Sequence, residues 1–153
     1  MSKSVAVTVT GTAHTSSERT FDTIVPIDLP SVFRGYGPLP AVTRTTDQTG
    51  AWDAVGQSRT VHLSDGSSAP ERINSYGRPG SFGYRVGPFT GMFGRIVEHA
   101  DGLFIFEESG GSTHVSWTYT FRARPGRGPL LPVVAILWRR YATRVLDAMI
   151  AGA

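Results

Sequence analysis

The feature that most constrains the fold is a long apolar helix predicted at the C-terminal end of the sequence. From about Leu130 onward, apolar residues recur at the three-to-four spacing of a buried helical face. They form two adjacent stripes: Leu130, Val134, Leu137, Tyr141 and Val145, then Leu131, Ala135, Trp138, Ala142 and Leu146. So broad an apolar face must be covered by other parts of the chain.

Most of the preceding sequence reads as short strands joined by tight turns, in keeping with its 18 glycines and 10 prolines. Alternation of apolar and polar residues predicts strands over residues 5–10, 42–46, 56–64, 71–76, 82–86, 103–108 and 114–124. Asp65-Gly66 is a hairpin turn signal. After the first strand, a cap at Ser16 predicts a short helix that Pro26 ends, and Asp28 with Pro30 predicts a second.

Residues 91–100 break the strand pattern. Phe93, Ile96 and Val97 fall at helical spacing, which predicts one or two helical turns over the edge of the sheet. Asp101-Gly102 then marks the restart of a strand. Gly91 and Gly94 would permit this segment to act as a mobile lid, and a fixed flap is the alternative.

These elements predict an α+β architecture in one domain spanning residues 1–153. An antiparallel sheet must bury one face, and only the C-terminal helix is long and apolar enough to cover it. We expect a curved antiparallel sheet of six to seven strands wrapped around that helix, with two short helices after the first strand. A strongly curved sheet leaves space beside the helix it grips, and that space is the expected site.

Composition excludes several classes of function. The chain has no cysteine, so disulfides and cysteine-ligated metals are ruled out. Its four histidines lack ligand spacing, and we expect no metal and no cofactor. The net charge of +3 is spread along the chain without a basic stripe, so nucleic acid is not an expected partner.

We also expect a cytoplasmic, soluble protein. The N-terminal residues alternate instead of forming an apolar signal segment, and the apolar run 129–138 is shorter than the ~20 residues of a membrane span. The broad face of the C-terminal helix could serve a homodimer as well as a core.

Several strings resemble the SRPBCC superfamily, which includes START lipid-binding domains, pollen-allergen-like proteins and polyketide cyclases. They are IVPIDLPSVFRGYGPLPAV, DQTGAWDAVGQSRTVHLSDGSS, FGYRVGPFTG and STHVSWTYTFRARPG. The sequence is most similar to small bacterial proteins of the polyketide cyclase/dehydrase type. The resemblance implies a helix-grip fold with a cavity for a small hydrophobic ligand, but no single reaction, since the superfamily holds carriers and enzymes. No complete catalytic set of the family maps onto this sequence, so catalytic residues stay unassigned.

Arg59 and Glu71 form the first candidate site pair. If the hairpin loop comprises three residues, Ser64 to Gly66, Arg59 stands opposite Glu71, and both share the inward parity of Val61. A buried guanidinium requires a partner because its desolvation is costly. The pair would be either a polar anchor for a ligand carbonyl, phenolate or carboxylate, or a structural salt bridge closing one end of the sheet.

Aromatic residues on the predicted inward faces supply the apolar part of the site. The candidate ligand-binding residues are Arg59, Glu71, Tyr84, Phe104, Trp117 and Tyr119. One hypothesis is a carrier of a lipid, polyketide or other aromatic metabolite. Another is a cyclase, dehydratase or aromatase using Arg59, Glu71 and Tyr84, and a third is a partner-binding module whose aromatic residues only fill the core.

Overall fold

A seven-stranded sheet dominates the computed structural model, which describes residues 3–153. Its strand order is β1-β7-β6-β5-β4-β3-β2, and all neighbouring strands are antiparallel. The strands are β1 (Ser4–Ala13), β2 (Val42–Thr46), β3 (Ser58–Leu63), β4 (Ser68–Gly77), β5 (Ser81–Val86), β6 (Val97–Ser109) and β7 (Ser112–Ala123). Only β1 is out of sequence order, because it pairs with β7 at the end of the sheet.

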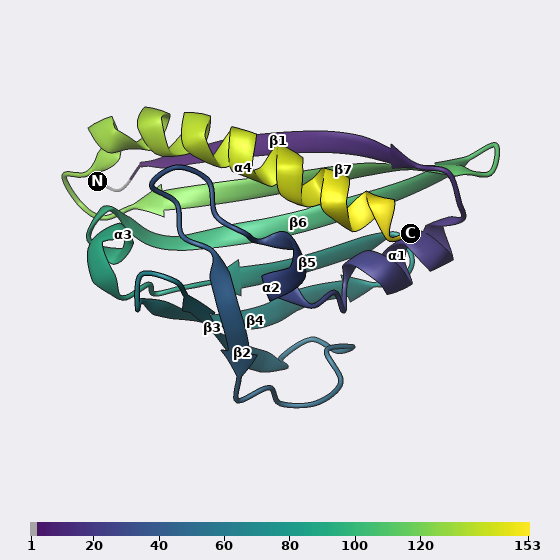
Figure 1. Ribbon diagram of the computed structural model, residues 1–153, viewed down its shortest axis with the longest axis horizontal. Coiled ribbons are helices and arrows are strands. Elements are labelled where there is room, and N and C mark those ends of the chain that lie inside the picture. The colour runs from purple at the N-terminus through teal and green to yellow at the C-terminus, as the bar shows by residue number, and fades with distance from the viewer. Residues whose placement is uncertain (1–2) are drawn as a thin grey trace.

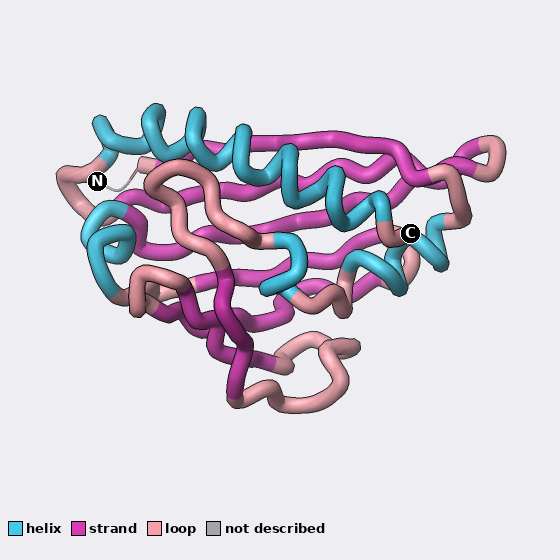
Figure 2. Tube along the Cα trace, viewed as in Figure 1, coloured by secondary structure: helices cyan, strands magenta, loops and turns pink. Residues whose placement is uncertain are grey.

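One long helix and three short ones accompany the sheet. They are α1 (Ser17–Ile24), α2 (Leu29–Val32), α3 (Gly91–Ile96) and α4 (Leu131–Ala151). The Ser16 side chain accepts the backbone N–H of Arg19 and caps α1, as the sequence predicts. Figure 1 shows α4 lying lengthwise over the sheet, with α1 and α2 near its C-terminal end, and Figure 2 shows the helices on one side of the strands. The predicted α+β architecture is confirmed.

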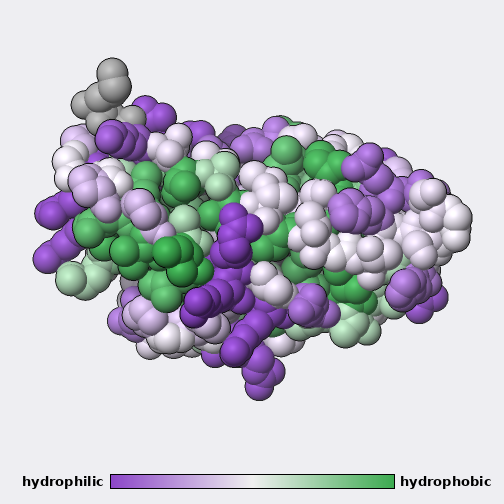
Figure 3. All heavy atoms as spheres, turned by 90° about the horizontal axis from the view of Figure 1, so that it is seen from above, coloured by the Kyte–Doolittle hydropathy of each residue, from purple (hydrophilic) through white to green (hydrophobic). Residues whose placement is uncertain are grey.

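The C-terminal helix buries most of both predicted stripes. Its buried residues are Leu131, Val134, Tyr141, Ala142, Val145, Leu146 and Met149. The first half departs from the prediction, because Leu130 is 41% exposed and lies in a short 3-10 turn before α4. Val133 and Ile136 are also exposed, and Figure 3 shows apolar surface reaching solvent on the side where α4 lies.

Within residues 3–153, no helix has the length and hydropathy needed to cross a membrane.

The hairpin between β3 and β4 has the three-residue loop that places Arg59 opposite Glu71. The backbone N–H of Leu63 donates to the carbonyl of Ser67 at 2.9 Å, and Gly66 takes the left-handed φ of +86°. Arg59 and Glu71 are direct partners in the register. The three-residue loop on which the predicted pairing of Arg59 with Glu71 depended is therefore present.

The predicted start of a strand at residue 103 is wrong, because β6 begins at Val97. Asp101 and Gly102 lie inside this strand, where Gly102 pairs with Tyr84 on β5 and with Tyr119 on β7. A Cβ atom at Gly102 would collide with the ring of Tyr84. The glycine therefore permits a close approach within the sheet instead of marking the start of a strand. The helical segment ends at Ile96, and its six residues agree with the one or two helical turns predicted.

Candidate functional site

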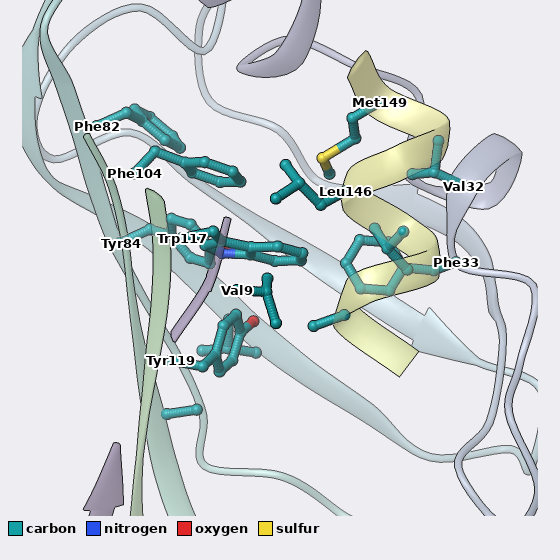
Figure 4. Close-up of a cluster of buried hydrophobic side chains, with 14 of the residues drawn as sticks. Val9, Val32, Phe33, Phe82, Tyr84, Phe104, Trp117, Tyr119, Leu146 and Met149 are labelled. Atoms are coloured by element: carbon teal, nitrogen blue, oxygen red, sulfur yellow. The ribbon is translucent and has the colours of Figure 1, made fainter. Parts of the chain in front are cut away.

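An apolar cavity of about 120 Å³ lies between the sheet and the helices. Strands β2 to β7 contribute to its wall, and α4 contributes Trp138, Tyr141 and Met149. Phe33, which follows α2, and Phe93 of α3 close other sides. Figure 4 shows aromatic rings from the strands facing Leu146, Met149 and Phe33 across the core. The position of this cavity beside α4 agrees with the space expected from a curved sheet.

Arg59 and Glu71 are the charged residues of the cavity wall among residues 3–153. The Nε of Arg59 donates to Oε1 of Glu71 at 2.6 Å, and each side chain is only 7% exposed. Within residues 3–153 the two terminal Nη nitrogens of Arg59 make no hydrogen bond, yet neither is fully enclosed. Arg59 lines the cavity, so among the described residues its Nη donors have no protein partner that a bound molecule would have to displace.

Burial governs the protonation of the polar groups in this wall. It raises the pKa of Glu71, although the nearby Arg59 charge and hydrogen bond oppose the shift. It also raises the pKa of Tyr84 well above its ordinary value, with Tyr119 and Glu71 adding to the effect. The pKa of Tyr119 is likewise raised, chiefly by burial. Both phenols are therefore neutral near pH 7 and can donate hydrogen bonds.

The cavity brings together five of the six predicted ligand-binding residues: Arg59, Glu71, Tyr84, Phe104 and Tyr119. Trp117 is not part of the wall, contrary to expectation. Its indole stacks on Phe104, with ring centroids 4.9 Å apart, and its Nε1 donates to the Tyr84 hydroxyl at 3.1 Å. Trp117 instead packs against Trp138 of α4 and against Phe33, with ring centroids 5.7 and 6.1 Å away. Strand parity fixes the face that a side chain occupies but not which residues it packs against.

Trp52 is a residue of this region that the sequence analysis missed. Its indole lies over the Arg59 guanidinium, with Cζ of Arg59 4.0 Å from the ring centroid. Trp52 belongs to the loop between β2 and β3 and has no periodic neighbours that would predict burial. A tryptophan in an otherwise polar, glycine-containing loop was the one available signal.

The loop 34–41 forms another boundary of the cavity. The Tyr141 hydroxyl accepts the backbone N–H of Gly35 at 3.0 Å and donates to the carbonyl of Pro40 at 2.9 Å. Leu39 and Pro40 line the cavity. Paired backbone hydrogen bonds between Tyr36 and Leu39 make this segment a tight turn. One side chain of α4 thus holds both ends of the loop.

The α3 segment, considered above as a lid or a flap, has its own anchor. The Gly94 carbonyl accepts a hydrogen bond from Nε of Arg124 at 2.9 Å, just after β7. Phe93 of α3 lines the cavity and packs edge-on against Phe89, with centroids 4.9 Å apart. The segment therefore closes one side of the cavity through aromatic contacts.

Comparisons with known proteins agree with this architecture. A family model described as "Polyketide cyclase / dehydrase and lipid transport" matches residues 4–152. No curated protein sequence matches the chain.

Three solved structures illustrate the shared fold. Ara h 8.0201 superposes with a TM-score of 0.74 at 17% identity, covering 97% of each chain. The Zhui aromatase/cyclase from Streptomyces sp. R1128 gives 0.73 at 13% identity, covering 97% of this chain and 93% of that one. The protein XoxI from Bacillus cereus gives 0.62 at 17% identity, covering 95% and 93%. At these identities the likeness shows the helix-grip fold alone.

Proposed function

Because the chain belongs to the polyketide cyclase/dehydrase and lipid transport family, we propose that it binds a small hydrophobic molecule in its cavity as a carrier or binding protein. The observation that carries this proposal is an apolar cavity whose wall, within residues 3–153, contains a single charged pair, Arg59 and Glu71. Sites for small molecules are commonly apolar with a few polar groups that fix orientation.

The residues of the wall favour a ligand with a flat apolar body and one oxygen-bearing end. Phe82, Phe104 and Trp138 supply ring surfaces for the apolar part. The Nη donors of Arg59 and the hydroxyl of Tyr119 suit a carbonyl, phenolate or carboxylate oxygen. This combination supports the choice of an aromatic metabolite, polyketide or lipid as the ligand class.

Native mass spectrometry of the purified protein tests the proposal. We expect a copurified small molecule, or uptake of added naphthalene derivatives at one per chain. Ala69→Leu should weaken uptake, because Ala69 lines the cavity and an added side chain would fill part of it. Ala148→Leu is the matched control, since Ala148 is exposed on α4. A protein that carries and takes up no small molecule would contradict the proposal.

A second candidate function is cyclisation or dehydration of a reactive polyketide. The observation that favours it is a buried carboxyl beside a guanidinium, with the neutral Tyr84 hydroxyl in the same wall. Arg59 would stabilise an enolate oxygen, Glu71 would carry the proton and Tyr84 would donate a hydrogen bond. Replacing each singly in an assay with an aromatic polyketide precursor would distinguish the two functions. An enzyme would lose turnover while keeping the ligand, whereas a carrier would show no turnover with any variant.

A further inference from the structure

Trp52 occupies an unusual position for a large apolar side chain. It lies in the loop 47–57, where it is only 3% exposed while the residues on either side of it are exposed. Its φ is +62°, a left-handed conformation that bulky residues rarely adopt. The Gln57 side chain holds the loop by accepting the backbone N–H of Asp53 at 2.7 Å. The loop thus fixes Trp52 in a conformation that a free chain would avoid.

The buried position of Trp52 is explained by a contact of its ring face and not by a hydrogen bond of its indole N–H. Its Nε1 is the one fully enclosed side-chain nitrogen or oxygen without a hydrogen bond among residues 3–153. Burying a donor without a partner costs free energy, so hydrogen bonding does not explain the placement. The contact that does is the one with Arg59, whose Cζ lies 4.0 Å from the ring centroid. A guanidinium over an indole is stabilised most where water is excluded.

Different parts of the Arg59 guanidinium have different neighbours. Trp52 covers one face but does not line the cavity, so it lies behind Arg59 as seen from the cavity. Glu71 occupies the Nε edge. The Nη edge is the part left for a bound molecule.

We propose that Trp52 is a positioning residue that holds the Nη edge of Arg59 toward the cavity, so that the site prefers an anionic oxygen group over a neutral one. This inference rests on the proposed function and specifies the ligand class of the same site. Without the indole, the flexible Arg59 side chain can turn away from the cavity or gain water, and either change weakens a charge-assisted contact. Contacts with the apolar body of the ligand do not involve Trp52.

The test compares two probes of the same apolar shape, 2-naphthoate and neutral 2-naphthalenemethanol, by isothermal titration calorimetry. For Trp52→Leu we expect affinity for the carboxylate to fall about tenfold and affinity for the alcohol to change less than twofold. Trp52→Phe keeps a smaller aromatic face and should lower the carboxylate affinity about threefold. Val55→Ala, at an exposed position of the same loop, is the control and should preserve both affinities.

The ratio of the two affinities separates positioning from support of the fold. Equal weakening of both probes in Trp52→Leu would overturn the inference, because a merely structural residue affects the whole cavity. If Trp52→Leu does not fold by circular dichroism, Trp52→Phe decides, and an unchanged ratio in that variant overturns the inference. A wild-type protein that binds neither probe would instead show that the proposed function fails, and the inference falls with it. If the wild type binds the probes but the ratio of carboxylate to alcohol affinity is unaltered in both variants, the inference fails while the proposed function stands.

Discussion

Trp117 donates its indole N–H to the hydroxyl of Tyr84 at 3.1 Å, which links β7 to β5 across β6. Trp117 is 1% exposed and Tyr84 is 5% exposed, so water does not replace this bond if it is lost. The bond thereby fixes Tyr84, which lines the cavity together with Arg59 and Glu71.

Trp117→Phe should therefore lower the free energy of unfolding by about 2–3 kcal/mol, from loss of packing volume and of the buried hydrogen bond. Urea denaturation measures this change. Trp138→Phe is the matched control, because Trp138 is only partly buried on α4. A cost for Trp117→Phe no greater than that of the control would contradict the structural role given to the bond.

Gly102→Ala should destabilise the protein by about 1–3 kcal/mol, the usual range for overpacking. The reason is that a Cβ at Gly102 would collide with the Tyr84 ring. Thermal unfolding measures the loss, and Gly80→Ala is the control because a Cβ there meets only an ordinary contact, 3.6 Å from the Gly77 carbonyl oxygen.

A double-mutant cycle identifies the source of the Gly102 effect. Combining Gly102→Ala with Tyr84→Leu should cost less than the sum of the two single changes, since the smaller side chain leaves room for the Cβ. Strict additivity would show that the collision with Tyr84 is not the cause.

Tyr141→Phe should loosen the loop 34–41. The change removes one acceptor and one donor, and leaves the Gly35 N–H and the Pro40 carbonyl without their partner. We expect faster amide hydrogen exchange in this loop and a loss of about 1–2 kcal/mol in stability. Tyr36→Phe is the comparison, because the Tyr36 ring stacks near Tyr141, with centroids 6.5 Å apart, but its hydroxyl does not hold the loop. Unchanged exchange in Tyr141→Phe would rule out the anchoring role.

Local patterns predicted the sheet well because strand periodicity and turn chemistry are properties of neighbouring residues. The pairing of Arg59 with Glu71 followed from one such property, the length of the loop ending at Gly66. Gly102 was misread as marking the restart of a strand, because a glycine before a strand looks the same in sequence as one inside a strand that makes room for a ring. What distinguishes them is Tyr84, which is adjacent in the sheet but distant in the chain.

The site was less accessible to prediction than the fold, for the same reason. Strand parity correctly turned Trp117 inward, but its absence from the cavity wall depends on how it packs beside Phe104 and against Trp138. Trp52 reaches Arg59 only because the loop 47–57 folds back in a left-handed conformation. Neither arrangement has a periodic signature, since both depend on packing between separate elements.

The pH dependence of stability should reveal the protonation of Glu71. Burial raises the pKa of Glu71 in the folded state above the ordinary value of 4.5. Between pH 4.5 and this raised pKa, the folded state therefore binds more protons than the unfolded state. The free energy of unfolding contributed by Glu71 therefore falls as the pH rises from about 4.5 through the raised pKa, and is constant above it. A tenfold difference in acidity between the two states corresponds to about 1.4 kcal/mol.

Comparing wild type with Glu71→Gln by urea denaturation from pH 4 to pH 8 isolates this contribution. Asp22 and Asp65 have lowered pKa values, through hydrogen bonds from Arg78 and Ser67 respectively, and they contribute the opposite slope. Because both are present in each protein, their slopes cancel in the difference. We expect wild type to lose stability relative to Glu71→Gln as the pH rises. A relative gain would mean that the Arg59 charge outweighs burial and holds the pKa of Glu71 below its ordinary value, which would leave Glu71 a permanent anion and remove it as a proton carrier.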